Sequence, residues 1–320
     1  MRVLVTGALG FIGNAVTRRL VVAGHDVVAL TSRRPGSLPA ATTTSSAAAE
    51  IVHADVRDAD AMRRAVTGTD AVCHLAALTH VRESTEQPDD YWQVNHGGTR
   101  NLVAAARAES ARTDKPIRFA FASAGAVYGV PEAQPIAEDT PLNPTSVYGE
   151  TKAAAEREVL DAPLDGRYGA VVLRVFNVTG AVGGRGDGDL SRIVPKALAV
   201  ARGDAPVLQI AGDGTAVRDF VHVDDLARAF ALALDHAEPD RRAVFNVGAT
   251  GAGVAEIIAR TREITGRPLP AEHLPPRPEP RVLLADTTRI RAALGWAPDR
   301  STLAEMIADA WAASGSIHSA

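Results

Sequence analysis

Three glycines follow directly after a short apolar run at the start of the chain. The run Arg2–Thr6 predicts a buried parallel strand, and Ile12–Ala23 has the pattern of a helix. Between them, Gly7 permits a tight turn, Gly10 lets the backbone approach a pyrophosphate, and Gly13 lets the helix lie close to the strand. The helix N-terminus then faces the phosphates with its backbone N–H groups. We therefore predict a dinucleotide site whose contacting residues are Gly7, Gly10, Phe11, Ile12 and Gly13.

Runs that predict buried strands alternate with helical patterns through the first 180 residues. The expected strands are 27–30, 51–53, 71–75, 117–123 and 170–175, and the expected helices are 58–67, 89–111 and 146–160. This alternation predicts an α/β fold built on a doubly wound parallel sheet of the Rossmann type. After residue 180 the alternation of strands and helices is interrupted by a glycine-rich stretch at 181–189 and a proline-dense connector at 268–280.

Two domains are therefore expected. The first is a dinucleotide-binding Rossmann domain over residues 1–180. The second is a smaller C-terminal α/β domain over residues 181–320 that binds the substrate, with the chain returning to the sheet near 208–250.

The composition limits the class of protein and its partners. A formal net charge of −4 offers no general attraction for nucleic acid or an anionic membrane. No apolar stretch approaches the roughly 20 residues that a membrane-spanning helix needs. The single cysteine, Cys73, excludes an internal disulfide and stands in an apolar run that predicts a buried thiol. These features together lead us to expect a soluble, cytoplasmic protein. The histidines show no metal-ligand spacing, so we expect no metal.

Tyr148 and Lys152 lie one turn apart on the same face of a predicted helix. A phenol has an unperturbed pKa of about 10, so it acts as a base near neutral pH only if that pKa is lowered. A neighbouring ammonium and a positive nicotinamide ring both favour the phenolate. Placed after strand–helix units that begin with the glycine turn, this pair predicts an enzyme that moves a hydride on a nicotinamide cofactor.

The spacing Gly-x2-Gly-x2-Gly, together with Tyr148-x3-Lys152, resembles the extended short-chain dehydrogenases/reductases. Two later segments, Arg174–Ala181 and Gly212–Asp225, resemble signatures of the NAD-dependent epimerase/dehydratase family within that branch. The resemblance runs over essentially the whole chain and is closest to the UDP-glucose 4-epimerase group.

The resemblance implies further contacts with the cofactor. Asp55 and Val56 match the pair that meets adenine, and the segment after the fourth strand matches the small-residue floor under the cofactor. That floor consists of Leu75, Ala76 and Ala77, and the remaining implied cofactor contacts are Ser32, Arg33, Asn95, Ser123, Tyr148 and Lys152.

The resemblance also implies contacts with a nucleotide sugar. Asn177 would meet the diphosphate or the sugar, and Arg218 would grip the diphosphate as a bidentate donor. A salt bridge from Arg218 to Asp219 or Asp224 is the structural alternative. The other implied substrate contacts are Thr79, Ala124, Tyr148, Arg277 and Glu279.

The end of the second strand usually separates NAD from NADP enzymes. A carboxylate there accepts hydrogen bonds from the ribose 2′-hydroxyl, whereas an arginine accommodates a 2′-phosphate. The chain reads Thr31-Ser32-Arg33-Arg34, which tolerates or even favours NADP, although two exposed arginines on a loop would read the same way. Because the family resemblance implies NAD, NAD is the cofactor that we expect.

Two alanines depart from related patterns. Family members carry Ser or Thr where this chain has Ala124, and Ser123 lies one position early, on the opposite side of an extended segment. Losing such a donor costs up to about 10²–10³ in rate if nothing replaces it. Ala126 stands where dehydratases and decarboxylases of this branch place an acid, which favours oxidation and reduction at one carbon over elimination.

We therefore expect a nucleotide-sugar 4-epimerase with tightly bound NAD, acting on a UDP- or dTDP-linked sugar. An NADPH-dependent 4-keto-sugar reductase of deoxysugar biosynthesis is one alternative, motivated by residues 31–34. A redox-sensing or scaffold protein that has lost turnover is another, motivated by Ala124. We also expect a homodimer formed through helices 89–111 and 146–160. The sequence names neither the sugar nor the nucleotide base.

Overall fold

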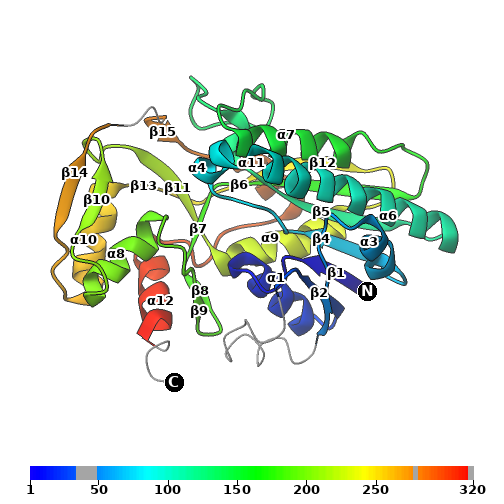
Figure 1. The fold of residues 1–320 in the computed structure, drawn as a ribbon, viewed down its shortest axis with the longest axis horizontal. Coiled ribbons are helices and arrows are strands. Elements are labelled where there is room, and N and C mark those ends of the chain that lie inside the picture. Colours follow the sequence, from blue (N-terminus) through cyan, green and yellow to red (C-terminus); the bar gives the residue numbers. More distant parts are fainter. Residues whose placement is uncertain (34–48, 277–279, 316–320) are drawn as a thin grey trace.

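The computed structural model describes residues 1–33, 49–276 and 280–315, and its largest element is a seven-stranded sheet (Figure 1). The strand order is β12-β6-β5-β4-β1-β2-β3, with every neighbouring pair parallel. The strands are β1 (Arg2–Thr6), β2 (Asp26–Thr31), β3 (Glu50–His53), β4 (Ala71–His74), β5 (Ile117–Ala124), β6 (Tyr168–Val175) and β12 (Arg242–Val247). The order reverses between β1 and β4, which makes the sheet doubly wound and confirms the predicted fold class.

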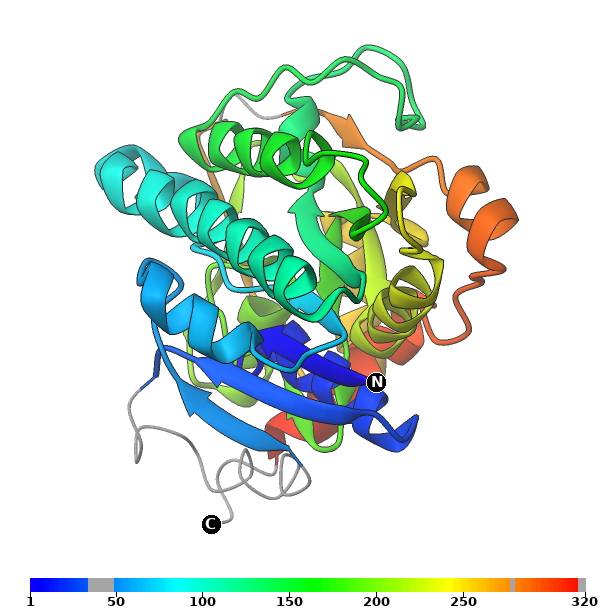
Figure 2. The same ribbon diagram turned by 90° about the vertical axis from the view of Figure 1, so that its right-hand side faces the viewer.

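Helices cover both faces of this sheet (Figure 2). On one face α1 (Phe11–Val22) packs against α9 (Val223–His236), and on the other lie α3 (Ala59–Val66), α6 (Gly98–Thr113) and α7 (Val147–Leu160). In the described ranges no helix combines the length and apolar character needed to cross a bilayer.

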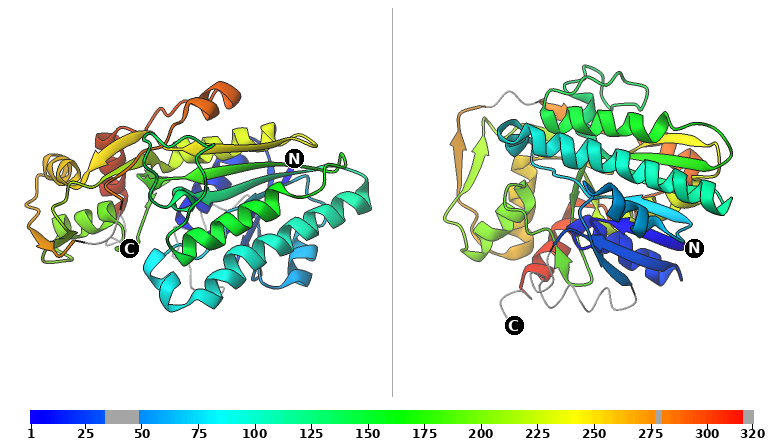
Figure 3. Two further views of the ribbon diagram at one scale, coloured as in Figure 1. Left: turned by 90° about the horizontal axis from the view of Figure 1, so that it is seen from above. Right: turned by 45° about the vertical axis from the view of Figure 1, so that its right-hand side comes forward.

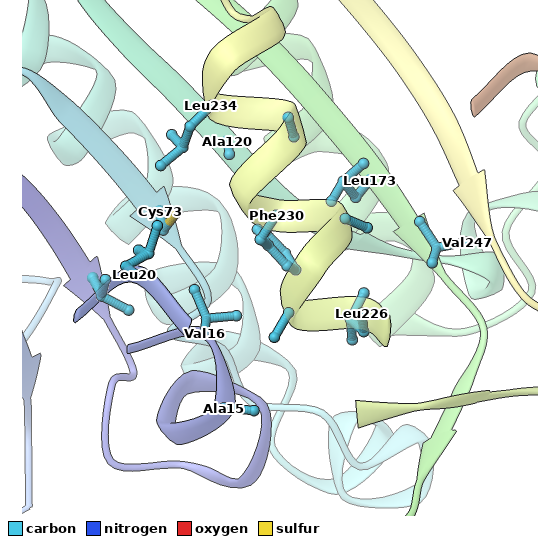
Figure 4. Close-up of a cluster of buried hydrophobic side chains, with 14 of the residues drawn as sticks. Ala15, Val16, Leu20, Cys73, Ala120, Leu173, Leu226, Phe230, Leu234 and Val247 are labelled. Atoms are coloured by element: carbon cyan, nitrogen blue, oxygen red, sulfur yellow. The ribbon is translucent and has the colours of Figure 1, made fainter. Parts of the chain in front are cut away.

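The layer between α1, α9 and the sheet is mainly apolar. Leu20 of α1 and Phe230 of α9 face the strands across Cys73 (Figure 4). Burying one such large side chain contributes about 1.5–3 kcal/mol. Burial also raises the pKa of the Cys73 thiol, so the cysteine is the protonated core residue that the sequence predicts.

The expected single helix over 89–111 is interrupted. It consists of α5 (Pro88–Tyr91), a wide π-helical turn (Trp92–Gly97) and α6, and it follows the short helix α4 (Val81–Glu86). Asn95 in the π turn is fully buried, and its side chain binds both the N–H and the carbonyl of Leu78. Such turns frequently accompany functional sites. Local sequence does not reveal this one because its partner is the backbone that follows β4.

The remainder of the chain forms a second group of elements beside the main sheet (Figure 3). In its largest sheet, β11 (Val217–His222) pairs with β7 (Asn177–Thr179), β13 (Thr250–Gly253) and β15 (Val282–Leu283). Two smaller pairs are β10 (Leu208–Ala211) with β14 (Ala271–Leu274) and β8 (Ala181–Val182) with β9 (Arg185–Gly186). The helices are α8 (Ile193–Arg202), α10 (Val254–Thr265), α11 (Thr288–Leu294) and α12 (Leu303–Gly315).

The chain crosses back from this second group to the main sheet. Within residues 208–250, α9 covers the main sheet and β12 pairs with β6, whereas β10 and β11 belong to the smaller sheets. The helices α8, α10 and α12 pack around Val194, Ile257 and Met306, which form a core separate from that of the main sheet.

Candidate active site

The glycine turn lies where the strand order of the main sheet reverses. Gly7 has a positive φ of 65°, and its carbonyl accepts the N–H of Gly10 at 2.9 Å. A Cβ on Gly7 would lie 2.9 Å from the backbone nitrogen of Ala76, and one on Gly13 would clash with the carbonyl of Gly7. The turn after β1, the start of α1 and the segment after β4 therefore lie in close backbone contact. Crevices at this point of a doubly wound sheet bind dinucleotides.

The first turn of α1 suits a pyrophosphate. Gly10 occupies the N-cap position and makes no side-chain cap, so the first N–H groups of the helix are not satisfied by a capping side chain. Backbone N–H groups at a helix N-terminus, with the helix dipole behind them, favour an anion. The residues present thus fit a dinucleotide at the place that the sequence predicts.

A buried hydrogen-bond network holds the backbone that follows β4. The hydroxyl oxygen of Thr6 accepts the N–H groups of Leu75 and Ala76, both at 3.1 Å, and lies 2.7 Å from Nδ1 of His74. Burial, reinforced by the positive charge of Lys152, lowers the pKa of His74 to about 3. The imidazole is therefore neutral, and its role is to hold the backbone after β4.

Tyr148 and Lys152 both lie on the first turns of α7. Ser146 caps this helix by accepting the N–H of Gly149 at 3.1 Å, which sets where the helix begins. Lys152 is only 3% exposed, and its Nζ lies 4.2 Å from the centroid of the Phe121 ring, a cation–π distance. Burial lowers the pKa of Lys152 to about 7, opposed by the negative charge of Glu156.

The phenol of Tyr148 is half-buried and surrounded by α4 and α5. The hydroxyl of Ser84 accepts the backbone N–H of Tyr148 at 3.1 Å, and the Tyr91 ring stands nearly perpendicular to the Tyr148 ring with centroids 6.5 Å apart. Burial raises the pKa of Tyr148 to about 12, and the nearby charge of Arg192 opposes the rise. In the protein alone the phenol is therefore protonated, and the lowered pKa that catalysis needs requires further positive charge in the site.

Residues 3–248 match the model of the NAD dependent epimerase/dehydratase family. The chain belongs to this family. A UDP-glucose 4-epimerase of Corynebacterium glutamicum is 35% identical over 322 residues, covering 98% of this chain and 95% of that protein. A UDP-glucose 4-epimerase of Streptomyces lividans is 37% identical over 322 residues, covering 96% and 94%. These matches confirm the resemblance found in the sequence.

Solved structures of family members agree. The crystal structure of a UDP-glucose 4-epimerase from Stenotrophomonas maltophila, with bound NAD and formylated UDP-arabinopyranose, superposes with a TM-score of 0.90. It is 31% identical, and the superposition covers 100% of both chains. The match extends the agreement from the Rossmann sheet to the second group of elements.

The loop before α8 links the second group of elements to α4. Arg192 contacts the carboxylates of Asp187 at 2.9 Å and Asp189 at 3.3 Å. Asp189 in turn lies 2.8 Å from Nε2 of His80, and this contact raises the pKa of the imidazole. The loop is thereby tied to α4, next to Tyr148. The sequence marks residues 181–189 as a glycine-rich stretch, but nothing in it identifies Arg192 or His80 as linking residues.

A buried ion-pair network lies behind α7. Glu156, one turn beyond Lys152, pairs with Arg174 of β6 through contacts of 2.8, 3.1 and 3.2 Å. Ser123, predicted to contact the cofactor, donates its hydroxyl to Glu156. Arg174 also donates to the hydroxyl of Tyr128 at 2.8 Å. Glu156 was missed in the sequence because a glutamate in a helix usually lies on a solvated face.

Several other predicted cofactor contacts follow β2, β3 and β4 or lie in α1 and the π turn. Val56 is buried beneath the start of α6, whereas the carboxylate of Asp55 is held by Arg57 at 2.7 Å. Ser32 and Arg33 are exposed just after β2. Asn95 acts on the backbone of Leu78, as described above. Phe11, Ile12 and Ala77 are partly buried, in α1 and after β4.

The predicted substrate contacts come from both halves. Ala124 is buried at the end of β5, and Thr79 is exposed immediately before His80. Asn177 of β7 donates to the carbonyl of Asp219 at 2.9 Å. The carboxylate of Asp219 accepts the N–H groups of Ala249 and Ala285, while Asp224 contacts Arg19 and Arg300. Arg218 lies on β11 and donates to the Val217 carbonyl. Arg277 and Glu279, and also Arg34, lie outside the described residues.

Proposed function

We propose that this protein is a nucleotide-sugar 4-epimerase that keeps NAD bound through the reaction and acts on UDP-glucose, UDP-galactose or a related sugar. The observation that carries the proposal is the position of Tyr148 and Lys152 on successive turns of α7, with Lys152 lying against Phe121 of β5 and close enough to His74 of β4 for its charge to act on that imidazole. The names of the relatives, UDP-glucose 4-epimerases matched over nearly their full length, support the same reaction.

The reaction requires the protein to position the sugar beside the cofactor and to transfer one proton. A nicotinamide dinucleotide held at the glycine turn would supply reversible hydride transfer at C4 of the sugar. Tyr148 is the group that accepts the proton of the 4-hydroxyl and gives it back. Lys152 supplies positive charge beside the phenolate, and Arg192 adds to it from the loop before α8.

Inversion also requires that the sugar turn while its nucleotide stays in place. Asn177 and Arg218 are held on two paired strands, β7 and β11, at the edge of the second group of elements. A site that fixes the diphosphate there and leaves the sugar few contacts would permit the rotation. Ala124, with no hydroxyl at the end of β5, is consistent with a loosely held sugar.

The test is an epimerase assay without added cofactor. Purified protein should convert UDP-glucose into UDP-galactose, or convert a uronic, N-acetyl or dTDP-linked analogue in the same panel, without net formation of reduced dinucleotide. Tyr148→Phe should lower kcat by at least about 10² while substrate binding persists. Tyr168→Phe is a matched control, because the Tyr168 hydroxyl is buried without a hydrogen-bond partner among the described residues. An inactive wild-type protein across the panel, or consumption of NADPH with a 4-keto sugar, would refute the epimerase.

We also propose that the protein is a homodimer formed through α6 and α7. These helices lie side by side on one surface of the molecule (Figure 2), and α6 exposes the small residues Ala104 and Ala108 there, beside Arg157 of α7. The small exposed residues of α6 let the helices of two subunits approach closely, so that α6 and α7 of each subunit would form a four-helix contact. Light scattering after gel filtration should give twice the chain mass of 33.5 kDa, and Ala104→Glu should shift it to the monomer.

A further inference from the structure

The short helix α4 contacts both the helix that carries Tyr148 and the loop before α8, residues 187–192 (Figure 1). The hydroxyl of Ser84 in α4 accepts the backbone N–H of Tyr148 at 3.1 Å. His80, at the N-cap position of α4, places Nε2 of its imidazole 2.8 Å from the carboxylate of Asp189 in the loop. Ser84 donates its own backbone N–H to the carbonyl of His80 at 3.0 Å, so the two contacts are one helical turn apart. One turn of helix thus connects Tyr148 to the second half of the chain.

The backbone of His80 is itself held by Tyr91, a fully buried residue of α5. The Tyr91 hydroxyl accepts the backbone N–H of His80 at 3.0 Å and lies 2.8 Å from its carbonyl oxygen. The ring of Tyr91 is the one that stands against the ring of Tyr148. The starting point of the His80 side chain is therefore fixed by the same residue that packs against the phenol.

The imidazole of His80 lies between two carboxylates. Its Nε2 faces Asp189 and its Nδ1 is 3.2 Å from Oε2 of Glu83 in α4. A neutral ring donates from only one nitrogen, whereas the imidazolium donates from both and satisfies both carboxylates. The contact with Asp189 is the main cause that raises the pKa of His80. The other groups that face this cluster are the Tyr91 hydroxyl, 2.9 Å from Glu83, and Arg192, which reaches it through Asp189.

Asp189 also fixes the guanidinium of Arg192. Its carboxylate lies 3.3 Å from Nε of Arg192 and accepts the backbone N–H of Ser191 at 2.9 Å. The buried carboxylate of Asp187 holds Nη1 of Arg192 at 2.9 Å. The positive charge held in this way acts on Tyr148, where it opposes the rise in pKa that burial causes. The contact between His80 and Asp189 therefore joins α4 to the residue whose charge reaches the phenol.

We propose that His80 and Asp189 are positioning residues of the epimerase, which clamp the loop before α8 onto α4 and so keep the charge of Arg192 beside Tyr148. The inference rests on the proposed function, because it takes Tyr148 as the group that loses its proton. A fixed positive charge stabilises a phenolate, and a loop that is not clamped supplies that charge for only part of the time. Because the clamp uses the imidazolium, it is lost as the pH rises through the raised pKa of His80.

The test measures kcat for epimerisation by full-length protein. His80→Gln keeps a hydrogen-bond donor but removes the charge, and since the ion pair is partly exposed we expect kcat to fall about two- to fivefold near neutral pH. His80→Lys keeps a cation for Asp189 and should restore kcat to within about twofold of wild type. Lysine stays charged to a pKa of about 10.4, so the ratio of the wild-type kcat to that of His80→Lys should fall as the pH rises from about 6.5 to about 9.

A double-mutant cycle shows whether His80 acts through Arg192. Arg192→Gln should lower kcat by about tenfold, and adding His80→Gln to it should lower kcat by no more than about 1.5-fold further. His236→Gln is the control. His236 ends α9, which leads to the amino end of β12, whereas the glycine turn follows the carboxyl end of β1. This variant should leave both kcat and its pH dependence unchanged.

An NMR titration of the His80 ring, assigned by its absence in His80→Gln, measures the contact without reference to activity. Asp189→Asn should lower the pKa of this imidazole, and an unchanged pKa would overturn the proposal. The proposal also fails if the losses in the double variant multiply, if His80→Lys is as slow as His80→Gln, or if the ratio of kcat values is constant with pH. Thermal melting of each variant checks that the fold is intact. If the wild-type protein epimerises no sugar in the panel, the proposed function fails, and the titration alone then decides whether the clamp exists.

Discussion

Replacing Glu156 by glutamine would leave the Arg174 guanidinium buried without its carboxylate. The two side chains are 2% and 7% exposed and share three contacts between 2.8 and 3.2 Å. Removing one partner of a buried ion pair destabilises a fold by about 3–5 kcal/mol, because the remaining charge stays out of water. We therefore expect Glu156→Gln to lower the free energy of unfolding by about that amount.

A double-mutant cycle measures the interaction itself. Arg174→Met leaves the Glu156 carboxylate unpaired, whereas the double variant leaves no buried charge, so its loss should be clearly smaller than the sum of the two single losses. Urea unfolding followed by circular dichroism, on protein stripped of nucleotide, gives the four free energies. Glu263→Gln, in the exposed Arg260–Glu263 pair, is the control and should cost less than about 1 kcal/mol. The reasoning is refuted if Glu156→Gln costs no more than this control, or if the two single losses add within about 0.5 kcal/mol.

Three other predictions concern the site. Gly13→Ala places a methyl group against the carbonyl of Gly7, so it should destabilise the fold by about 1–3 kcal/mol and raise the dissociation constant for NAD⁺. Gly188→Ala is the control, because its added methyl group has no atom within 4 Å. In melting and binding assays it should change neither the stability nor the dissociation constant. Ala124→Ser should raise kcat by up to about 10², measured in the epimerase assay, and an unchanged or lower kcat would show that the missing hydroxyl is not limiting. The pKa of Lys152 is lowered from 10.5 to about 7 by burial, so between pH 7 and 10 the unfolded chain binds more protons than the native one. The free energy of unfolding of nucleotide-free protein should therefore rise over this range by up to about 1.4 kcal/mol per pH unit relative to Lys152→Met, and parallel curves for the two proteins would contradict the lowered pKa.

Much of the fold and the central part of the site follow from local sequence. The glycine turn, the strands through β6 and the helix that carries Tyr148 and Lys152 are each specified by residues close together in the chain, because backbone geometry at glycine and the period of apolar residues are local properties. The π turn around Asn95 and the link from Asp189 to His80 could not be found in this way. Both depend on partners that folding brings from elsewhere, namely the Leu78 backbone and the loop before α8.

The protonation states show the same division. The sequence places a phenol and an ammonium one turn apart, and it predicts from their charges that the phenol is easily ionised. The structure shows that burial dominates both groups in the protein alone, raising the pKa of Tyr148 to about 12 and lowering that of Lys152 to about 7. Desolvation depends on every element that covers a side chain, which no spacing of residues records.

By itself the sequence determined the family, and it predicted the dinucleotide site and the two residues that we propose move a proton, because each rests on a short segment whose geometry is set by its own residues. Only the tertiary structure decided that Glu156 and Arg174 form a buried pair behind that site, and that Arg185 crosses from the second half of the chain to the glycine turn. These contacts join residues 18 and 176 positions apart in the chain. Their existence depends on how the helices and sheets pack, which is a property of the whole fold.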